Sequence, residues 1–402
     1  NICRSGYASF AHCLKLSVFK YTRTLFALRC KKQNLAMTVK VVVIGGGSAG
    51  TVIAYQLSKN TAIELTLIDK KEYSDWNIAA PRALVDAKYS TEISIPHTSY
   101  LKKGTFLRGE VKTITDDEVT VSTSTGEKVL QFDYAVLTPG SAYPFFKATE
   151  TSVEERNASY EKVGGVVKEA KEILIVGGGT TGVEVAAEIV TEYPDKKVTI
   201  VTSAASLIPA LTPKAIKTAT DFLTAKKATI ITNDTVYFPA STGLPSLVHQ
   251  TVSTSNGKQL STDLILVTAG SGKPNTAFIE PTLPDILDEK KRIKVEPSLR
   301  VVGHPKLFAA GDACNADDRF SYIAADTESG IVIANISKLA KNSGAKGLKV
   351  YKKYPNPVTI FTLGRTKAVF VTPMFTLTGF MPRKMKSGDL FLSKRKKTLG
   401  IN

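Results

Sequence analysis

The chain has 402 residues, of which 43% are hydrophobic and 22% charged, and its formal net charge is +17. This length exceeds what a single hydrophobic core usually supports, so we expect two or three domains. Apolar runs are too short to predict a membrane-spanning helix, and four scattered cysteines give neither a disulfide framework nor a zinc-ligand spacing. The four histidines form no metal cluster in the sequence, so no metal site is predicted and a bound cofactor must carry any chemistry.

Residues 1–36 form a basic leader that we exclude from the fold. They hold seven Lys or Arg and no Asp or Glu, a composition typical of a mitochondrial transit peptide. A second interpretation is that the protein starts at Met37, directly before the first strand, and that the leader is upstream sequence foreign to it. The first interpretation predicts a mitochondrial location, and the second predicts a cytoplasmic protein with peripheral membrane association.

The first strand pattern leads into a dinucleotide-binding signature. Apolar residues 39–44 are followed by Gly-Gly-Gly-Ser-Ala-Gly, a helical stretch and a second strand that ends on Asp69. A dinucleotide site requires strand, Gly-x-Gly-x-x-Gly, helix, strand and acid in this order. Gly45 permits the tight turn, Gly47 lets a pyrophosphate approach the backbone, and Gly50 lets helix and strand pack closely. Asp69 can accept hydrogen bonds from a ribose diol.

The same unit returns further along the chain. Apolar residues 173–176 lead into a second Gly-x-Gly-x-x-Gly with Gly177, Gly179 and Gly182, then a helix and a strand that ends on Thr202. Two complete units predict two separate dinucleotide sites. Since Thr202 replaces the acid that would repel a 2'-phosphate, we expect NADH as substrate with NADPH tolerated.

A third signature follows the apolar stretch 301–310, where Gly311 and Asp312 end a strand pattern. Together with the two fingerprints it resembles the second FAD motif of two-dinucleotide-binding flavoproteins, in which the Asp holds the ribitol chain. The apolar stretches 134–140 and 264–270 look like the crossings between the FAD and NAD domains of that superfamily. The resemblance implies FAD at the first fingerprint and NADH or NADPH at the second.

Two short stretches narrow the resemblance: Glu-Tyr-Pro ending at Pro194, and Asp-Leu-Phe beginning at Asp389. With them, the chain from about residue 40 to 392 is similar to the ferroptosis suppressor and apoptosis-inducing factor-like family. That similarity implies a FAD-dependent NAD(P)H oxidoreductase that reduces ubiquinone or a related quinone. It also implies functional roles for Glu184 and Lys386, and a flavin-side position for Arg82. Glu328 departs from the family, because it falls close to where a His is usual.

Rival functions share these domains. Disulfide reductases need a redox-active cysteine pair, which the sequence lacks between Cys30 and Cys314. Monodehydroascorbate or ferredoxin reductases and type II NADH dehydrogenases remain alternatives, and they differ in the electron acceptor. A non-enzyme alternative is a DNA-binding protein like the related apoptosis-inducing factors, with nucleic acid as a secondary partner of this basic chain.

The expected architecture is α/β, with two Rossmann-like dinucleotide-binding domains and a small C-terminal α/β domain, as a monomer or homodimer. The FAD domain is expected at 37–144 and 264–330, the NAD(P)H domain at 145–263, and the C-terminal domain with its basic tail at 331–402.

The tail combines seven basic residues with Phe380, Met381, Met385, Leu390, Phe391 and Leu392. One interpretation is docking on an anionic membrane through Lys394, Arg395, Lys396 and Lys397. The other is that the apolar residues complete the core while the charges stay in water.

Overall fold

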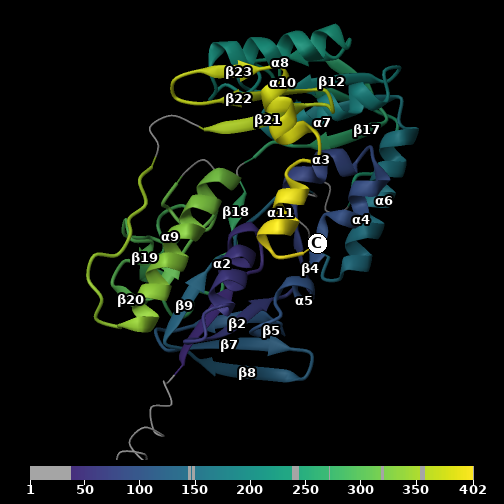
Figure 1. Cartoon of the computed structure of the whole chain (residues 1–402). Coiled ribbons are helices and arrows are strands. Elements are labelled where there is room, and N and C mark those ends of the chain that lie inside the picture. The colour runs from purple at the N-terminus through teal and green to yellow at the C-terminus, as the bar shows by residue number, and fades with distance from the viewer. Residues whose placement is uncertain are drawn as a thin grey trace, which may run out of the picture.

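The computed structural model describes residues 38–401 except 144–145, 147–149, 238–243, 271, 318–320 and 354–357, so the leader lies outside the described residues. Two α/β units lie one above the other in Figure 1, and a C-terminal β-hairpin region covers the upper unit. The predicted fold class, with two Rossmann-like units, is confirmed.

The first unit is built on a six-stranded sheet of order β19-β20-β9-β1-β2-β5. Its inner strands pair in parallel and are buried on both faces, which explains why they appear in the sequence as continuous apolar runs. Helices α2 (Ser48–Ser58) and α9 (Tyr322–Lys341) pack against each other beside it. The strands are β1 (Val39–Ile44), β2 (Ile63–Asp69), β5 (Thr105–Arg108), β9 (Tyr134–Leu137), β19 (Arg300–Val301) and β20 (His304–Ala309).

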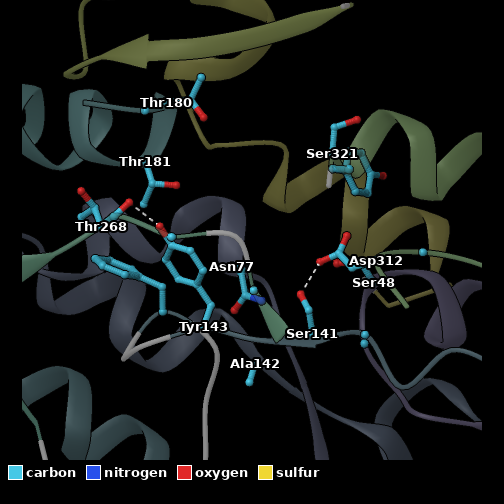
Figure 2. Close-up of a pocket in the computed structure, with 18 of the residues that line it drawn as sticks. Ser48, Asn77, Ser141, Ala142, Tyr143, Thr180, Thr181, Thr268, Asp312 and Ser321 are labelled. Atoms are coloured by element: carbon cyan, nitrogen blue, oxygen red, sulfur yellow. Dashed lines mark hydrogen bonds between the residues drawn. The ribbon is translucent and has the colours of Figure 1, made fainter. Parts of the chain in front are cut away.

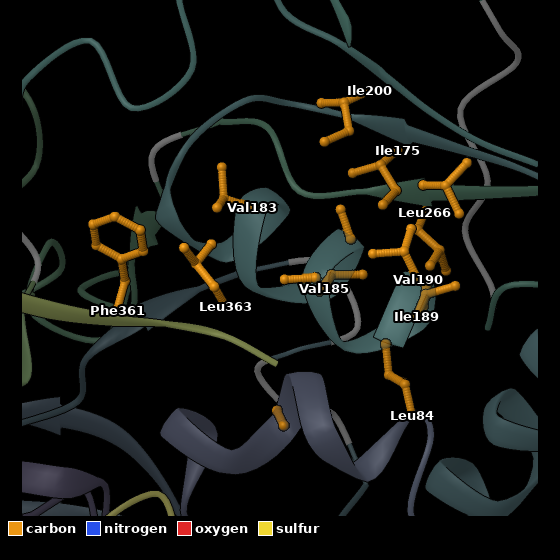
Figure 3. Close-up of a cluster of buried hydrophobic side chains, with 14 of the residues drawn as sticks. Leu84, Ile175, Val183, Val185, Ile189, Val190, Ile200, Leu266, Phe361 and Leu363 are labelled. Carbon is orange, nitrogen blue, oxygen red and sulfur yellow. The ribbon is translucent and has the colours of Figure 1, made fainter. Parts of the chain in front are cut away.

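The second unit has a parallel four-stranded sheet of order β13-β12-β11-β17. Figure 3 shows side chains of helix α7 (Thr180–Glu192) packing on this sheet, with Val185 and Ile189 near Ile175 and Leu266. Helix α8 (Pro213–Ala225) contacts α7, and α6 (Val153–Glu169) precedes the sheet. The strands are β11 (Glu172–Val176), β12 (Lys197–Val201), β13 (Thr229–Ile231) and β17 (Leu264–Val267).

The two connections between the units run side by side. Strand β10 (Ser141–Ala142), leaving the first sheet, pairs antiparallel with β18 (Lys273–Pro274), which returns to it. Because β17 pairs with β11, residues 264–267 belong to the second sheet. The predicted boundary at residue 264 therefore falls one strand too early.

Shorter elements surround the two sheets. Three small antiparallel sheets contain β3 (Tyr73–Asp75) and β4 (Ser94–Pro96); β6 (Glu110–Ile114), β7 (Glu118–Thr123) and β8 (Gly126–Gln131); and β14 (Val236–Tyr237), β15 (Gln250–Thr254) and β16 (Gln259–Thr262). The short helices are η1 (Asn77–Ala79), α3 (Ala80–Ala83), α4 (Ala87–Glu92), α5 (His97–Tyr100) and η2 (Pro284–Ile286). Across the described ranges, no helix is long and apolar enough to cross a membrane.

The C-terminal region divides between the two units. Strand β21 packs on α7, and Phe361 and Leu363 join its core (Figure 3). Leu399 instead enters the core of the first unit. The predicted boundary at residue 330 is also wrong, because it cuts α9, which packs on α2. The elements are β21 (Thr359–Leu363), β22 (Lys367–Val371), β23 (Thr376–Thr378), α10 (Phe380–Pro382), the π-helix η3 (Arg383–Ser387) and α11 (Leu392–Thr398).

Only part of the basic tail is exposed to water. Leu390, Leu392 and Arg395 are all buried, whereas Lys394 and Lys397 are exposed. Helical spacing explains the difference, since α11 turns one face toward the protein and the other outward. Core packing is therefore confirmed for the two leucines and is wrong for Phe380, Met381 and Met385, which are exposed. The buried Arg395 and Lys386 fit neither interpretation.

Candidate functional site

One cavity of about 1520 Å³ extends from the first fingerprint to the second. Figure 2 shows Ser48 and Asp312 on one side and Thr180 on the other, with Tyr143 and Asn77 between them. Small-molecule sites usually enclose roughly 300–1,000 Å³. The cavity therefore has room for two ligands at the same time.

The glycines of the first fingerprint divide into two kinds. Gly45 has φ +95°, and a Cβ at Gly50 would overlap the carbonyl oxygen of Gly45, so both positions require glycine. A Cβ at Gly47 would meet no protein atom within 4 Å and would stand in the cavity. Gly47 and the first free N–H groups of α2 thus form a cradle that fits a diphosphate group.

The second fingerprint repeats this arrangement. Gly177 has φ +118°, and a Cβ at Gly182 would overlap the carbonyl oxygen of Gly177. Gly179 faces open space within the cavity and precedes α7, the helix whose first N–H groups face a ligand. Both loops consequently fit the diphosphate of a dinucleotide.

Asp69 lines the cavity at the end of β2, where the sequence places a ribose-binding acid. Its Oδ2 accepts a hydrogen bond of 2.5 Å from the Gly46 amide, and its Oδ1 accepts one from Lys71. The fully buried His97 lies behind it, with Nε2 3.9 Å from Oδ2. Burial lowers the pKa of His97 to about 4, so this ring is neutral at pH 7. Spacing gave no signal for His97, because it comes from a separate segment.

Gly311 and Asp312 reach the cavity at the end of β20. Asp312 accepts a 2.9 Å hydrogen bond from the Ser141 hydroxyl (Figure 2), which fixes its carboxylate beside the first fingerprint. The Gly311 amide donates to Glu328 at 2.6 Å. Burial raises the pKa of Glu328 to about 7. The cavity therefore has a buried carboxyl group next to Gly311 whose raised pKa brings its titration close to neutral pH.

Glu184 and Lys386 form an ion pair in the cavity wall. Lys386 Nζ lies 2.7 Å from Glu184 Oε1 and 3.0 Å from the Ile360 carbonyl oxygen. Glu184 Oε1 also accepts from the amide and hydroxyl of Thr362. The two side chains are only 11% and 8% exposed, so the pair is held in one geometry. Glu184 comes from α7 and Lys386 from the π-helix η3, and such π-turns are frequent at functional sites.

Arg82 is not among the residues that line the cavity, contrary to its predicted flavin-side role. It is fully buried, its Nη2 lies 2.8 Å from Glu188 Oε1, and its Nη1 donates to the Ser387 carbonyl at 2.7 Å. The guanidinium turns toward the carboxylate of Glu188 because a buried cation needs a counter-charge. Arg82 thus joins the first unit to α7 and to η3.

Thr202 follows β12 directly and lines the cavity. This is the position, at the end of the second strand of the second fingerprint unit, where the sequence places it. The Asp234 amide donates to the Thr202 carbonyl at 3.1 Å, and Asp234 is also among the residues that line the cavity. The second fingerprint therefore has a carboxylate nearby that its own strand does not supply. Its origin in the turn after β13 explains why the spacing did not reveal it.

A family model described as pyridine nucleotide-disulphide oxidoreductase matches residues 39–347. The chain belongs to this family. Human ferroptosis suppressor protein 1 is 30% identical over 365 residues, which cover 89% of this chain and 95% of that protein. Apoptosis-inducing factor homolog B of Dictyostelium discoideum is 28% identical over 376 residues, which cover 88% of this chain and 95% of that protein. The sulfide:quinone oxidoreductase structure from Aquifex aeolicus matches with a TM-score of 0.70 at 17% identity, and the match covers 90% of this chain and 92% of that one. The chain is thus a pyridine-nucleotide oxidoreductase by family, and the family implies FAD and NAD(P)H.

The glycine geometry predicts opposite effects for two alanine substitutions in the first fingerprint. Gly47→Ala should leave the free energy of unfolding almost unchanged but reduce flavin retention, because its Cβ enters the cavity. Gly50→Ala should destabilise the fold by about 1–3 kcal/mol, because its Cβ overlaps backbone. Urea unfolding and the visible flavin absorbance of the purified proteins measure the two effects. Full flavin retention by Gly47→Ala would contradict the cradle.

Glu328 predicts a pH-dependent stability. Its folded pKa is about 7 and the ordinary value is 4.5, so its stabilising contribution is complete below pH 4.5 and is lost as pH rises through 7. Relative to Glu328→Gln, the wild-type free energy of unfolding should fall by up to roughly 3 kcal/mol over this range, at 1.36 kcal/mol per pKa unit. Urea unfolding of both proteins from pH 5 to 8 tests this. A constant difference would show that Glu328 does not titrate there.

Proposed function

We propose that the protein is a FAD-dependent NAD(P)H:quinone oxidoreductase. The observation that carries the proposal is the single cavity that joins both fingerprints and has the Glu184–Lys386 pair in its wall. Two dinucleotides bound at opposite ends of one cavity would place their reactive rings near its middle. The fold of the family provides the same two binding units.

The residues sort into two cofactor sites. The glycine-rich loop of the first fingerprint, with Asp69 and Asp312, would hold FAD. The glycine-rich loop of the second fingerprint, with Thr202, would hold NADH or NADPH. When bound, the flavin supplies two-electron transfer between a nicotinamide and an acceptor. Cys314 offers no competing thiol chemistry, because it is buried and burial raises the pKa of its thiol well above the usual range.

Lys386 supplies a fixed positive charge in the cavity wall. Glu184 and the Ile360 carbonyl hold its ammonium group, and the buried setting keeps water from the pair. An ammonium group in such a low-dielectric position stabilises negative charge that develops nearby, and it can donate a hydrogen bond to a carbonyl oxygen. Glu184 keeps this charge in place and thereby acts as a positioning residue.

A quinone fits the remaining wall of the cavity. Tyr322, Ile323, Phe361 and Phe391 line it with apolar surface, which suits a planar acceptor better than a small charged one. A redox-active cysteine pair, which a disulfide acceptor would need, is missing from the sequence between residues 31 and 313. The fold neighbour from Aquifex aeolicus is named as a quinone oxidoreductase, which agrees with this choice of acceptor.

A membrane-stored quinone requires a docking surface, and we propose that it is the apolar tip on α10 and the β22–β23 turn. The tip consists of exposed Met374, Phe375, Phe380, Met381 and Met385. Helix α10 contacts both strands, and exposed Arg383 and Lys384 follow it. Apolar residues flanked by cations favour an anionic lipid surface, with each cation contributing about 1 kcal/mol. Of the four tail residues predicted to dock, Arg395 is buried, whereas the exposed Lys394 and Lys397 stay a prediction as further cations of the docking surface.

The ion pair predicts a loss of turnover that persists in the folded, flavin-loaded variants, although removing one partner of a buried pair also lowers the free energy of unfolding. Lys386→Met and Glu184→Gln should each lower the kcat for NADH-dependent reduction of a soluble quinone analogue by about tenfold or more, which is 1.4 kcal/mol of activation free energy. Lys384→Met removes an equal charge two residues away, but on the exposed side, and should keep full turnover. Stopped-flow and steady-state assays of all three flavin-loaded variants test this.

The wild type decides the function as a whole. A protein that is colourless after purification and does not bind added FAD would contradict the proposal. Equal or faster turnover with the monodehydroascorbate radical or with ferredoxin would keep the cofactors and replace the quinone. Oxidation of NADH with none of these acceptors, combined with DNA binding that weakens steeply with salt, would favour the nucleic-acid alternative.

The apolar tip predicts selective membrane binding. Phe380→Ser should weaken binding to vesicles that contain anionic lipid, and should slow reduction of a lipid-embedded quinone while sparing the soluble analogue. Val129→Ser removes a side chain of similar exposure from β8, at the far end of the molecule in Figure 1, and serves as control. Vesicle co-sedimentation and the two quinone assays measure the effects. Equal behaviour of the two variants would reject the tip as the docking surface.

A further inference from the structure

Arg395 on α11 is a buried cation beside the first fingerprint. Its side chain is 1% exposed, and its guanidinium stacks on the ring of Trp76 at 5.1 Å. Nη1 donates to the Ser48 carbonyl at 3.2 Å and Nη2 to the Ser74 hydroxyl at 3.4 Å. Nε has no partner. A group with five N–H donors thus makes two hydrogen bonds, both to uncharged atoms.

Among the described residues no carboxylate forms an ion pair within 4.0 Å with Arg395, and Asp326 is the one acid whose charge acts on it from further away. On the same helix, Lys396 forms an ion pair with Glu92 of α4. Arginine stays charged in proteins, and a buried cation without a counter-charge costs several kcal/mol. Stacking on Trp76 offsets only part of that cost. The protein would therefore gain stability if an anion were placed nearby.

The surroundings of Arg395 show where that anion would lie. Ser48 is the first residue of α2 and lines the cavity directly after Gly47, the glycine with open space before it. Tyr322, which lies edge-on to Trp76, lines the cavity as well. The guanidinium thus lies against the first turn of α2, whose free N–H groups face the cradle, although Arg395 is not itself among the residues that line the cavity.

Helix α11 is held firmly enough to fix this charge. Trp76 donates from Nε1 to the Leu390 carbonyl at 2.9 Å, just before the helix. Leu399, just after it, is fully buried in the core of the first unit. A Cβ at Gly400 would overlap the Tyr55 hydroxyl, so the chain passes closely over α2. The C-terminal helix is consequently part of the wall of the first site.

We propose that Arg395 provides the counter-charge for the diphosphate of the dinucleotide at the first fingerprint, so that cofactor binding and docking of α11 stabilise each other. This rests on the proposal that FAD binds there. Arg395 acts through Ser48 and through the electrostatic field, and is a positioning residue. By linkage, the protein with FAD bound gains stability from Arg395, whereas the protein without FAD loses stability by burying its charge.

The test compares Arg395→Met with Lys394→Met, which removes the same charge from the adjacent exposed position. Titration of the flavin-free proteins with FAD and with ADP, followed by fluorescence and calorimetry, gives the affinities. Arg395→Met should weaken the affinity for both ligands by about tenfold or more, because both carry a diphosphate whose negative charge the buried guanidinium would stabilise through a low-dielectric interior. Arg395→Lys should recover part of the loss, and Lys394→Met should bind like the wild type.

Thermal unfolding separates this role from simple packing. Flavin-free Arg395→Met should be as stable as the flavin-free wild type or more stable, while its FAD-loaded form should be less stable than the loaded wild type. A packing role predicts destabilisation in both states, and that result would overturn the proposal. An unchanged affinity of Arg395→Met for FAD would also overturn it, as would a weakened affinity for FAD with an unchanged affinity for ADP. A wild type that binds no FAD would instead overturn the proposed function.

Discussion

The structure depends on two buried acids that lie one helical turn apart on α7. Glu184 binds Lys386 from the C-terminal region, and Glu188 binds Arg82 from the first unit. Removing one partner of a buried ion pair leaves a charge in a low-dielectric interior, at a cost of about 3–5 kcal/mol. The helix that begins at the second fingerprint is thus held in a fixed position relative to the rest of the chain. In this arrangement both glycine-rich loops open into one cavity.

Local signals in the sequence predict the parts of the site that lie within single strand–loop–helix units. Gly47, Gly179 and Thr202 occupy the positions that their spacing assigns, because each is fixed by a backbone pattern only a few residues long. Arg82 shows where this reasoning ends. Its partner Glu188 is 106 residues away in sequence, and residue type alone does not distinguish a cofactor ligand from half of an interdomain ion pair.

The sequence pattern also does not predict which charged residues are buried. The run from Lys394 to Lys397 has one composition throughout, yet only Arg395 within it faces the core of the protein. Helical periodicity fixes which of these residues share a face, but not which face packs inward. The two misplaced domain boundaries have a related cause. An apolar strand such as β17 or a helix such as α9 has the same sequence pattern in either unit, and only pairing decides where it belongs.

The packing of α11 on the first unit has a consequence for biosynthesis. Ser48 and Arg395 are 347 residues apart, so the contact between them cannot form until the segment that contains α11 has left the ribosome. The N-terminal strands of the first unit emerge early, yet the surface of α2 stays uncovered throughout synthesis of the second unit, because α9 and α11 both follow it. The nascent protein must remain in this unfinished state without aggregating. Exposed aromatic surface at Trp76 therefore marks a nascent chain in which α9 and α11 have not yet docked.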